Sequence, residues 1–210
     1  MDREIDLKDC SRKATYEFFK DYRDPFFNFT ANVDVTELYD FCRIRKLSFS
    51  LAALWVALQA ANSIPEFRTR LRDGRIIEFS EVQATQTILN DDDTFSFSYY
   101  ENRPNVIEFV NAGQAATAKY KELKTFDVES DRLDLIYFSV IPWVSFTSFK
   151  HASRLERTLT IPRIVFGRFF SEGQRQKMPL SVEANHMVMD GLHVGRFFNS
   201  FEELARRSRI

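Results

Sequence analysis

The chain has 210 residues, of which 44% are hydrophobic and 28% charged, and it is long enough to bury a sizeable core. Its 29 basic and 30 acidic side chains leave a formal net charge of −1, so there is no global electrostatic case for binding nucleic acid or a membrane surface. No apolar leader and no run of about 18 apolar residues is present, and we therefore expect a cytoplasmic protein without a transmembrane helix.

Helical and strand patterns alternate in the first half of the chain. Ser11 caps a predicted helix at Ser11–Tyr22, which turns Tyr16, Phe18 and Phe19 inward. The elements predicted next are a strand at Phe27–Val33, a helix from Asp34 or Thr36 through Arg43, an apolar helix at Ser50–Ser63 that stops near Pro65, a hairpin turned at Arg72–Arg75, and a strand pair at Thr85–Leu89 and Phe95–Tyr99.

The turn of that strand pair, Asn90–Asp93, contains three consecutive aspartates. Such a cluster allows a cation site, but no further oxygen ligands follow at the spacing of a calcium loop, which favours a solvated turn.

The second half of the chain continues the alternation. Its predicted elements are an amphipathic helix at Val106–Lys124, strands at Leu135–Val140 and Ile164–Phe169, a turn at Ser171–Lys177, a strand at Leu180–Ala184, and a closing helix at Gly191–Arg207. No linker, internal repeat or shift in composition divides the chain, so we interpret residues 1–210 as a single domain. The alternation indicates helices packed on a sheet.

The phenylalanines and cysteines indicate what kind of interior and sites to expect. The 22 phenylalanines indicate a bulky aromatic core, an aromatic-lined pocket or a buried subunit interface, and plain core packing is the simplest of these interpretations. Cys10 and Cys42 lack the spacing of a metal site, so we expect reduced thiols and no bound metal.

The segment His186–Gly191 carries the clearest chemical pattern. A predicted strand ends just before His186, and Asp190 and Gly191 open the closing helix. This spacing can hold an imidazole at the strand end while the carboxylate braces the turn, and histidine is well suited to take a proton near neutral pH. A histidine at a strand end is more often structural than catalytic, and an aspartate at a helix start is also a good cap, so both interpretations stay open here.

A second candidate is the proline-led segment Pro142–Phe149, in which bulky apolar side chains alternate with hydroxyls. A hydroxyl in such a dry environment can stabilise a developing oxyanion, while the alternative is an ordinary strand edge. The sequence has no G-x-S-x-G elbow, which argues against a serine nucleophile of the hydrolase type. It also has no phosphate-binding loop and no dinucleotide fingerprint.

Taken together, these segments resemble the chloramphenicol acetyltransferase family over nearly the whole chain. The most specific pair is Pro142–Phe149 with His186–Gly191, at the family's separation and without an insertion. The other segments that carry the resemblance are Arg12-Lys13, Asp34-Val35-Thr36, Pro65-Glu66-Phe67-Arg68, Arg72-Asp73-Gly74, Thr94-Phe95-Ser96 and Asn185–Phe197. The shorter H-x-x-x-D-G pattern also occurs in acyltransferase cores of 2-oxo acid dehydrogenase complexes and in peptide-synthetase condensation domains, but the Pro-Trp-Val segment favours the chloramphenicol enzymes.

The resemblance implies an α/β (α+β) two-layer sandwich, with a mixed sheet and helices packed on one face. It implies a homotrimer with active sites at subunit interfaces and acetyl transfer from acetyl-CoA to a hydroxyl of chloramphenicol. His186 would be the general base that lets this hydroxyl attack the thioester directly, and Ser148 would donate a hydrogen bond to the oxyanion. Asp190 would pair with Arg12 to brace the turn, without relaying a proton.

The resemblance also assigns a substrate wall and a coenzyme site. By position, Phe19, Phe27, Thr87 and Phe95 are candidates for the aromatic and apolar wall around the acceptor, although each also suits plain core packing. Arg168 and Phe169 fall where the family binds the coenzyme, at positions usually held by lysine and tyrosine.

Two further departures from the family leave the acceptor open. Asn185 replaces the first of two adjacent histidines, and Val165 replaces a threonine near the transition state. The alternatives are therefore an O-acetyltransferase for another small hydroxylated compound and an inactive trimeric scaffold of the same fold.

Overall fold

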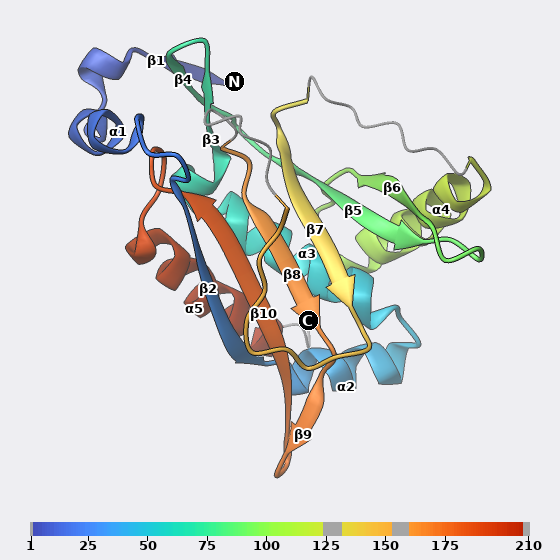
Figure 1. The fold of residues 1–210 in the computed structure, drawn as a ribbon. Helices are drawn as coiled ribbons and strands as arrows, with labels where there is room; N and C mark the ends of the chain where they lie inside the picture. Colours follow the sequence, from blue (N-terminus) through green and yellow to red (C-terminus); the bar gives the residue numbers. More distant parts are fainter. Residues whose placement is uncertain (1, 124–131, 153–159, 208–210) are drawn as a thin grey trace.

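The computed structural model describes residues 2–123, 132–152 and 160–207 (Figure 1). In this part of the chain a seven-stranded sheet has the order β2-β10-β8-β7-β5-β6, with β9 paired to β10. Its strands are β2 (Phe26–Asp34), β5 (Gln83–Leu89), β6 (Phe95–Tyr100), β7 (Leu135–Ile141), β8 (Arg163–Gly167), β9 (Phe170–Glu172) and β10 (Arg175–Asn185). The pairs β5–β7 and β7–β8 are parallel and the others antiparallel, so the sheet is mixed.

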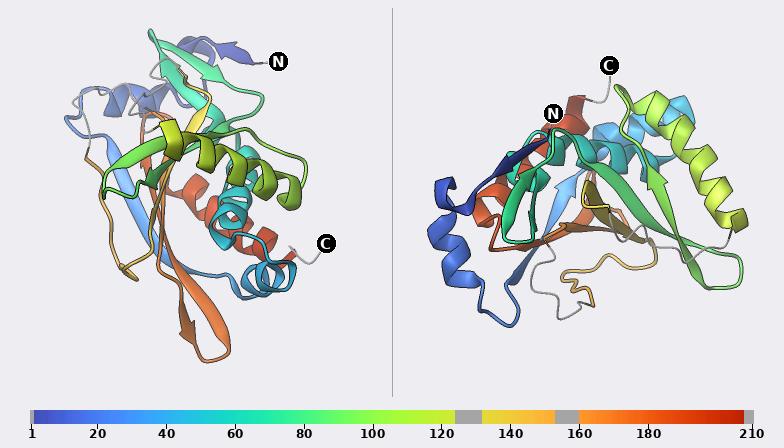
Figure 2. Two further views of the ribbon diagram at one scale, coloured as in Figure 1. Left: turned by 90° about the vertical axis from the view of Figure 1, so that its right-hand side faces the viewer. Right: turned by 90° about the horizontal axis from the view of Figure 1, so that it is seen from above.

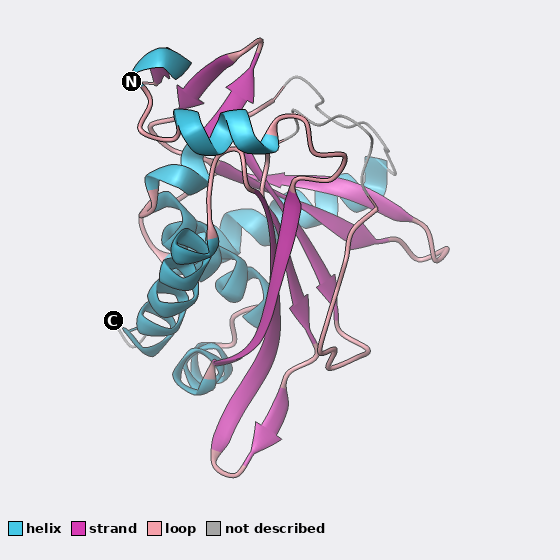
Figure 3. Cartoon of the chain, turned by 60° about the vertical axis from the view of Figure 1, so that its left-hand side comes forward, coloured by secondary structure: helices cyan, strands magenta, loops and turns pink. Residues whose placement is uncertain are grey.

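Four helices cover one face of this sheet, as Figure 2 and Figure 3 show. They are α2 (Thr36–Arg45), α3 (Phe49–Asn62), α4 (Val106–Leu123) and α5 (Gly191–Arg207). Alternate strand residues such as Phe138, Phe166 and Leu180 point into the core beneath them, and α3 is buried along most of its length. Burying these side chains is the main stabilising contribution to the fold. The expected two-layer arrangement, a mixed sheet with helices on one face, is confirmed.

A smaller antiparallel sheet lies at the end of the main sheet where β10 ends (Figure 1). It consists of β1 (Arg3–Ile5), β4 (Arg75–Glu78) and β3 (Thr69–Arg72), and the short helix α1 (Lys13–Phe19) lies beside it. Leu71, Ile76 and Met187 form a small apolar cluster against which Tyr16 and Phe19 pack. The N-terminal segment is therefore fastened to the turn that begins at His186.

The segment that follows β7, residues 142–152, crosses the face of the sheet opposite the helices (Figure 2, right). Strand alternation sends Ser139, Val165 and Ser181 to this face, because their neighbours along each strand point into the helical core. We call it the open face of the sheet.

Two local predictions were wrong. Helix α1 begins at Lys13 after Arg12, so Ser11 is not its cap, and Phe18 is 62% exposed instead of turned inward. The predicted turn Ser171–Lys177 is a hairpin, in which β9 and the start of β10 pair across Gly173. Gly173 has a φ of +60°, a conformation that glycine adopts without steric cost.

The remaining predicted elements agree with the structure to within a few residues, except that β10 begins at Arg175 and not at Leu180. Lys124 of the fourth predicted helix lies outside the described residues. The turn with three aspartates closes the β5–β6 hairpin as expected, and Asp92 accepts hydrogen bonds from Thr94.

Candidate functional site

His186 directly follows strand β10 and opens a tight turn into helix α5. Its backbone N–H donates to the carbonyl of Pro25 at 3.0 Å. The buried Asn185 holds the rest of the turn, because its side chain accepts from the N–H of Met187 at 2.9 Å and its carbonyl accepts from Val188 and Met189. The position of the histidine is therefore set by a closed network of backbone hydrogen bonds.

The imidazole of His186 lies between two phenylalanine rings. Its centroid is 4.5 Å from that of Phe19, with 9° between the planes, and 4.1 Å from that of Phe27, with 28°. The two rings fix the plane of the imidazole and leave 28% of the side chain exposed. Two of the four residues predicted to line the acceptor wall thus contact the histidine directly.

Asp190 joins His186 to Arg12. Its Oδ1 is 3.2 Å from His186 Nδ1, and its Oδ2 accepts from Arg12 Nη1 at 2.7 Å. The same guanidinium donates through Nη2 to the carbonyl of His186 at 3.1 Å. Arg12 therefore binds both ends of the turn, the carbonyl of His186 and the carboxylate of Asp190. Asp190 also contacts the imidazole of His186, and the sequence did not indicate this second contact.

This arrangement determines which nitrogen of His186 can act as a base. The hydrogen bond from Arg12 lowers the pKa of Asp190, so its carboxylate is ionised at neutral pH and can only accept. The neutral imidazole of His186 consequently carries its proton on Nδ1 and its lone pair on Nε2. Among the described residues, Nε2 has no hydrogen-bond partner. It is thus free to accept a proton from a bound molecule.

The Asp190→Asn variant should unfold more easily than the wild type at neutral pH. A neutral amide cannot form an ion pair with the mostly buried Arg12, so we expect the free energy of unfolding to fall by about 1 kcal/mol. This value is modest because Asp190 is 40% exposed. Since the pKa of Asp190 is lowered from 3.8, this stabilisation is complete above pH 3.8 and is lost as the pH falls through the lower folded-state value. Urea unfolding at pH 7 and at successively lower pH measures it.

Asp40→Asn is the matched control for this variant, because it removes the exposed pair with Arg43. We expect almost no change there. Equal stability of the Asp190→Asn variant and the wild type at pH 7 would show that Arg12 and Asp190 do not brace the turn.

Neither Ser148 nor the other two predicted wall residues contact His186 in the described part of the chain. Ser148 is exposed on the segment that crosses the open face, and no contact joins it to the imidazole in the described part of the chain. Thr87 and Phe95 lie on β5 and β6, three and four strands along the sheet from β10. Within one subunit the residues in contact with His186 are therefore separate from a second group, Thr87 and Phe95.

The second group also contains a hydroxyl that the sequence did not indicate. Ser139, on β7, is half-buried, and its Oγ lies 3.1 Å from the Oγ1 of Thr87. It faces the open side of the sheet, with Val165 beside it on β8. A serine at an alternate position of an otherwise apolar strand, just before Pro142, was the available signal.

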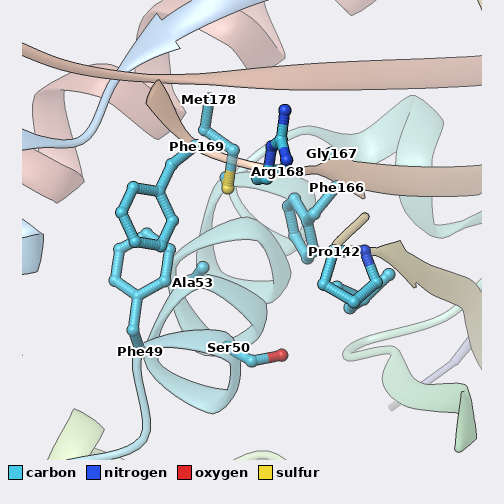
Figure 4. Close-up of a pocket in the computed structure, with 10 residues that line it drawn as sticks. Phe49, Ser50, Ala53, Pro142, Phe166, Gly167, Arg168, Phe169 and Met178 are labelled. Atoms are coloured by element: carbon cyan, nitrogen blue, oxygen red, sulfur yellow. The ribbon is translucent and has the colours of Figure 1, made fainter. Parts of the chain in front are cut away.

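Arg168 and Phe169 both line an apolar pocket of about 180 Å³ between the start of α3 and the ends of β7 and β8 (Figure 4). The Phe169 ring packs against Phe49, with 5.4 Å between centroids, and the exposed guanidinium of Arg168 lies at the rim. Ser145 donates to the carbonyl of Arg168 at 2.7 Å, which fastens the crossing segment to this pocket.

Comparisons with known proteins identify the family of this chain. A family model described as chloramphenicol acetyltransferase matches residues 2–202. The chain belongs to the chloramphenicol acetyltransferase family. A chloramphenicol acetyltransferase of Klebsiella sp is 26% identical over 95% of this chain and 91% of its own length, and one of Clostridium perfringens is 28% identical over 96% and 93%. A solved chloramphenicol acetyltransferase structure, 23% identical, superposes with a TM-score of 0.87 over 97% of this chain and 99% of its own.

Membership of the chloramphenicol acetyltransferase family makes this protein an acyltransferase. In the described ranges, none of its helices combines the length and the apolar character needed to cross a membrane. The same ranges hold no group of three or more metal-ligating histidine, cysteine or acidic side chains. Cys10 and Cys42 are both free thiols.

Proposed function

We propose that this protein transfers the acetyl group of acetyl-CoA to a hydroxyl of chloramphenicol, with His186 as the general base. The observation that supports this most directly is the His186 ring itself. Its plane is held by Phe19 and Phe27, its Nδ1 faces an ionised carboxylate, and its Nε2 has no hydrogen-bond partner in the described part of the chain. A base held in this way needs no rearrangement before proton transfer.

Acetyl-CoA supplies an activated acyl group, so the protein needs little beyond proximity, a base and an oxyanion donor. Nε2 of His186 takes the proton of the acceptor hydroxyl while that oxygen forms a bond to the thioester carbonyl carbon. When the tetrahedral intermediate collapses, the C–S bond breaks, and the imidazolium returns its proton to the departing thiolate. No acyl-enzyme is required.

The pocket beside Arg168 is suited to part of the coenzyme. Its walls are apolar apart from Ser50 and Arg168, which matches an extended pantetheine arm, and the guanidinium at the rim matches the charge of the phosphates. Arg168 and Phe169 would hold the coenzyme there.

Ser50→Phe is expected to raise the KM for acetyl-CoA about tenfold with little change in kcat, because the added ring occupies the pocket without touching His186. Initial rates at varied acetyl-CoA measure it. Ala112→Phe, which adds the same ring to an exposed position of α4, should leave both constants unchanged. An unaltered KM in the Ser50→Phe enzyme would place the coenzyme elsewhere.

We further propose a homotrimer with active sites between subunits. The two separate groups of predicted residues support this arrangement, since His186 with its phenylalanines and the Ser139–Thr87 pair lie at different strands of one chain. Apolar side chains of Phe95, Trp143 and Val144 are also exposed, as expected of a surface that another subunit covers. The site is therefore complete only when a neighbouring open face meets His186.

We place the activity in the cytoplasm and assign it to one domain. Both cysteines are free, which suits a reducing compartment, and acetyl-CoA is available there. The family model covers nearly the whole chain, which supports a single acetyltransferase domain.

The proposed activity is tested by following the release of free CoA thiol spectrophotometrically with acetyl-CoA and chloramphenicol.

A second candidate acceptor is another small hydroxylated compound. Val165 on the open face supports it, because the resemblance expects a hydroxyl at this position. Turnover of another acceptor from a panel, with none of chloramphenicol, would select that alternative. An absence of transfer to every acceptor would leave a trimeric scaffold, which has no need of a free and oriented imidazole.

A further inference from the structure

We propose that His193 is a positioning residue for His186, acting through Asp190 and itself oriented by Glu66. His193 lies in the first turn of α5, with only 9% of its side chain exposed. The inference rests on the proposed function and concerns how the base of that reaction is held.

The hydrogen bonds around His193 select one tautomer. The backbone N–H of Asp190 donates to His193 Nδ1 at 2.9 Å, so this nitrogen carries a lone pair. The proton of the neutral ring is then on Nε2, which lies 3.3 Å from Glu66 Oε1. Glu66 belongs to the 3₁₀ helix Pro65–Arg68, so two elements that are distant in the sequence determine the state of this ring.

His193 has the place that glutamate or glutamine usually takes in a capping box, where the third helical residue reaches back to the N–H of the N-cap. Its own N–H also donates to the Asp190 carbonyl, at 3.0 Å. The backbone of Asp190 is thereby fixed on both sides. Because the Asp190 carboxylate determines which nitrogen of His186 is protonated, a displaced Asp190 backbone would release the imidazole from its productive tautomer.

The side chains form one chain of contacts, Glu66–His193–Asp190–His186, that passes through the Asp190 backbone. The second nitrogen of this buried ring needs a hydrogen-bond partner. Glu66 provides that partner and holds Nδ1 as the acceptor, the way outer groups orient a functional histidine.

Kinetics of four variants test the proposal. His193→Leu removes the acceptor and is expected to lower kcat about 10- to 100-fold, with KM for both substrates within about twofold. His193→Asn places Oδ1 near the position of Nδ1 and should stay within about threefold of the wild-type kcat. Glu66→Ala should lower kcat about fivefold, and Glu66→Gln, which still offers an acceptor, should restore it. Asn199→Ala, on the exposed side of α5, is the control.

A purely structural cap would lower the melting temperature of these variants without lowering kcat of the folded enzyme. Wild-type kcat in folded His193→Leu would overturn the proposal. It would also fail if folded His193→Asn were as slow as His193→Leu.

A readout that needs no turnover separates this proposal from the proposed function. The chain has three histidines, so ¹⁵N spectra of histidine-labelled protein can assign each ring. We expect His186 as the Nδ1–H tautomer in the wild type and in His193→Asn, and a mixture of tautomers in His193→Leu. This result in a protein without acetyl transfer would sustain the positioning role and refute the activity. An unchanged His186 tautomer in His193→Leu would refute the positioning role whatever the activity.

Discussion

Replacing His186 by alanine is expected to lower kcat for acetyl transfer by at least about a thousandfold, within the range that general bases contribute. Among the described residues, Asp190 is the carboxylate in contact with His186, and it is a poor substitute base because its pKa is lowered and it is directed at Arg12. The acceptor hydroxyl would then have to lose its proton to water. Release of CoA thiol at saturating acetyl-CoA and acceptor measures this loss, since saturation removes any effect on binding.

The His186→Gln variant separates loss of the base from loss of packing. Glutamine keeps a planar polar group between Phe19 and Phe27 but has no nitrogen that accepts a proton near neutral pH. We expect it to be as inactive as the alanine variant, with the melting temperature and the sedimentation mass of the wild type. Normal turnover in a folded His186→Gln enzyme would exclude the proposed mechanism.

The fold was predictable where local patterns are strong. The apolar helix α3, the hairpin turned by Asp73 and Gly74 and the turn between β10 and α5 all follow from short-range spacing and from backbone preferences. Strand β10 was predicted too short. Its first residues, Arg175, Gln176 and Lys177, are polar because they belong to a hairpin with solvated side chains, so they lack the alternation that marks a half-buried strand.

The residues of the turn at His186 were predictable from the sequence, whereas the side chains that pack around this turn were not. His186, Asp190 and Arg12 could be named because a strand end, a turn and a helix start occur at a spacing that the family shares. The stacking of Phe19 and Phe27 on the imidazole depends on how α1 and β2 lie in space, which no sequence period encodes. The pairing of His193 with Glu66 likewise joins elements that only the tertiary fold brings together.

The choice of oxyanion donor also depends on burial and contacts that only the tertiary fold determines. The family resemblance assigns the oxyanion hydrogen bond to Ser148, in the most distinctive segment of the chain, and this assignment stays a prediction. The structure places it on an exposed segment, whereas Ser139 is half-buried in a strand of the sheet and paired with Thr87. Donors that stabilise a developing negative charge act best when rigid and shielded from water. We propose Ser139 for this role because it is half-buried within one subunit, whereas Ser148 would depend on a neighbouring subunit for its burial.

Ser139→Ala is therefore expected to lower kcat about 100- to 1,000-fold, the cost typical of removing one oxyanion donor, with only small changes in KM. The methyl group is smaller than the hydroxymethyl group and leaves the β7 backbone pairing intact, so the enzyme should stay folded. Single-turnover measurement of CoA thiol release reports the chemical step directly, without a contribution from slow product release.

Ser148→Ala is the matched variant, because it removes the same atom from the serine that the sequence favoured. If Ser139 is the donor, Ser148→Ala keeps kcat within about threefold of the wild type, since the hydroxyl of Ser148 then makes no hydrogen bond to the oxyanion. The reverse order of the two losses would return the role to Ser148 and would require the neighbouring subunit to bury that segment against His186. Equal and small losses in both variants would mean that the oxyanion is stabilised by backbone N–H groups, which neither substitution removes.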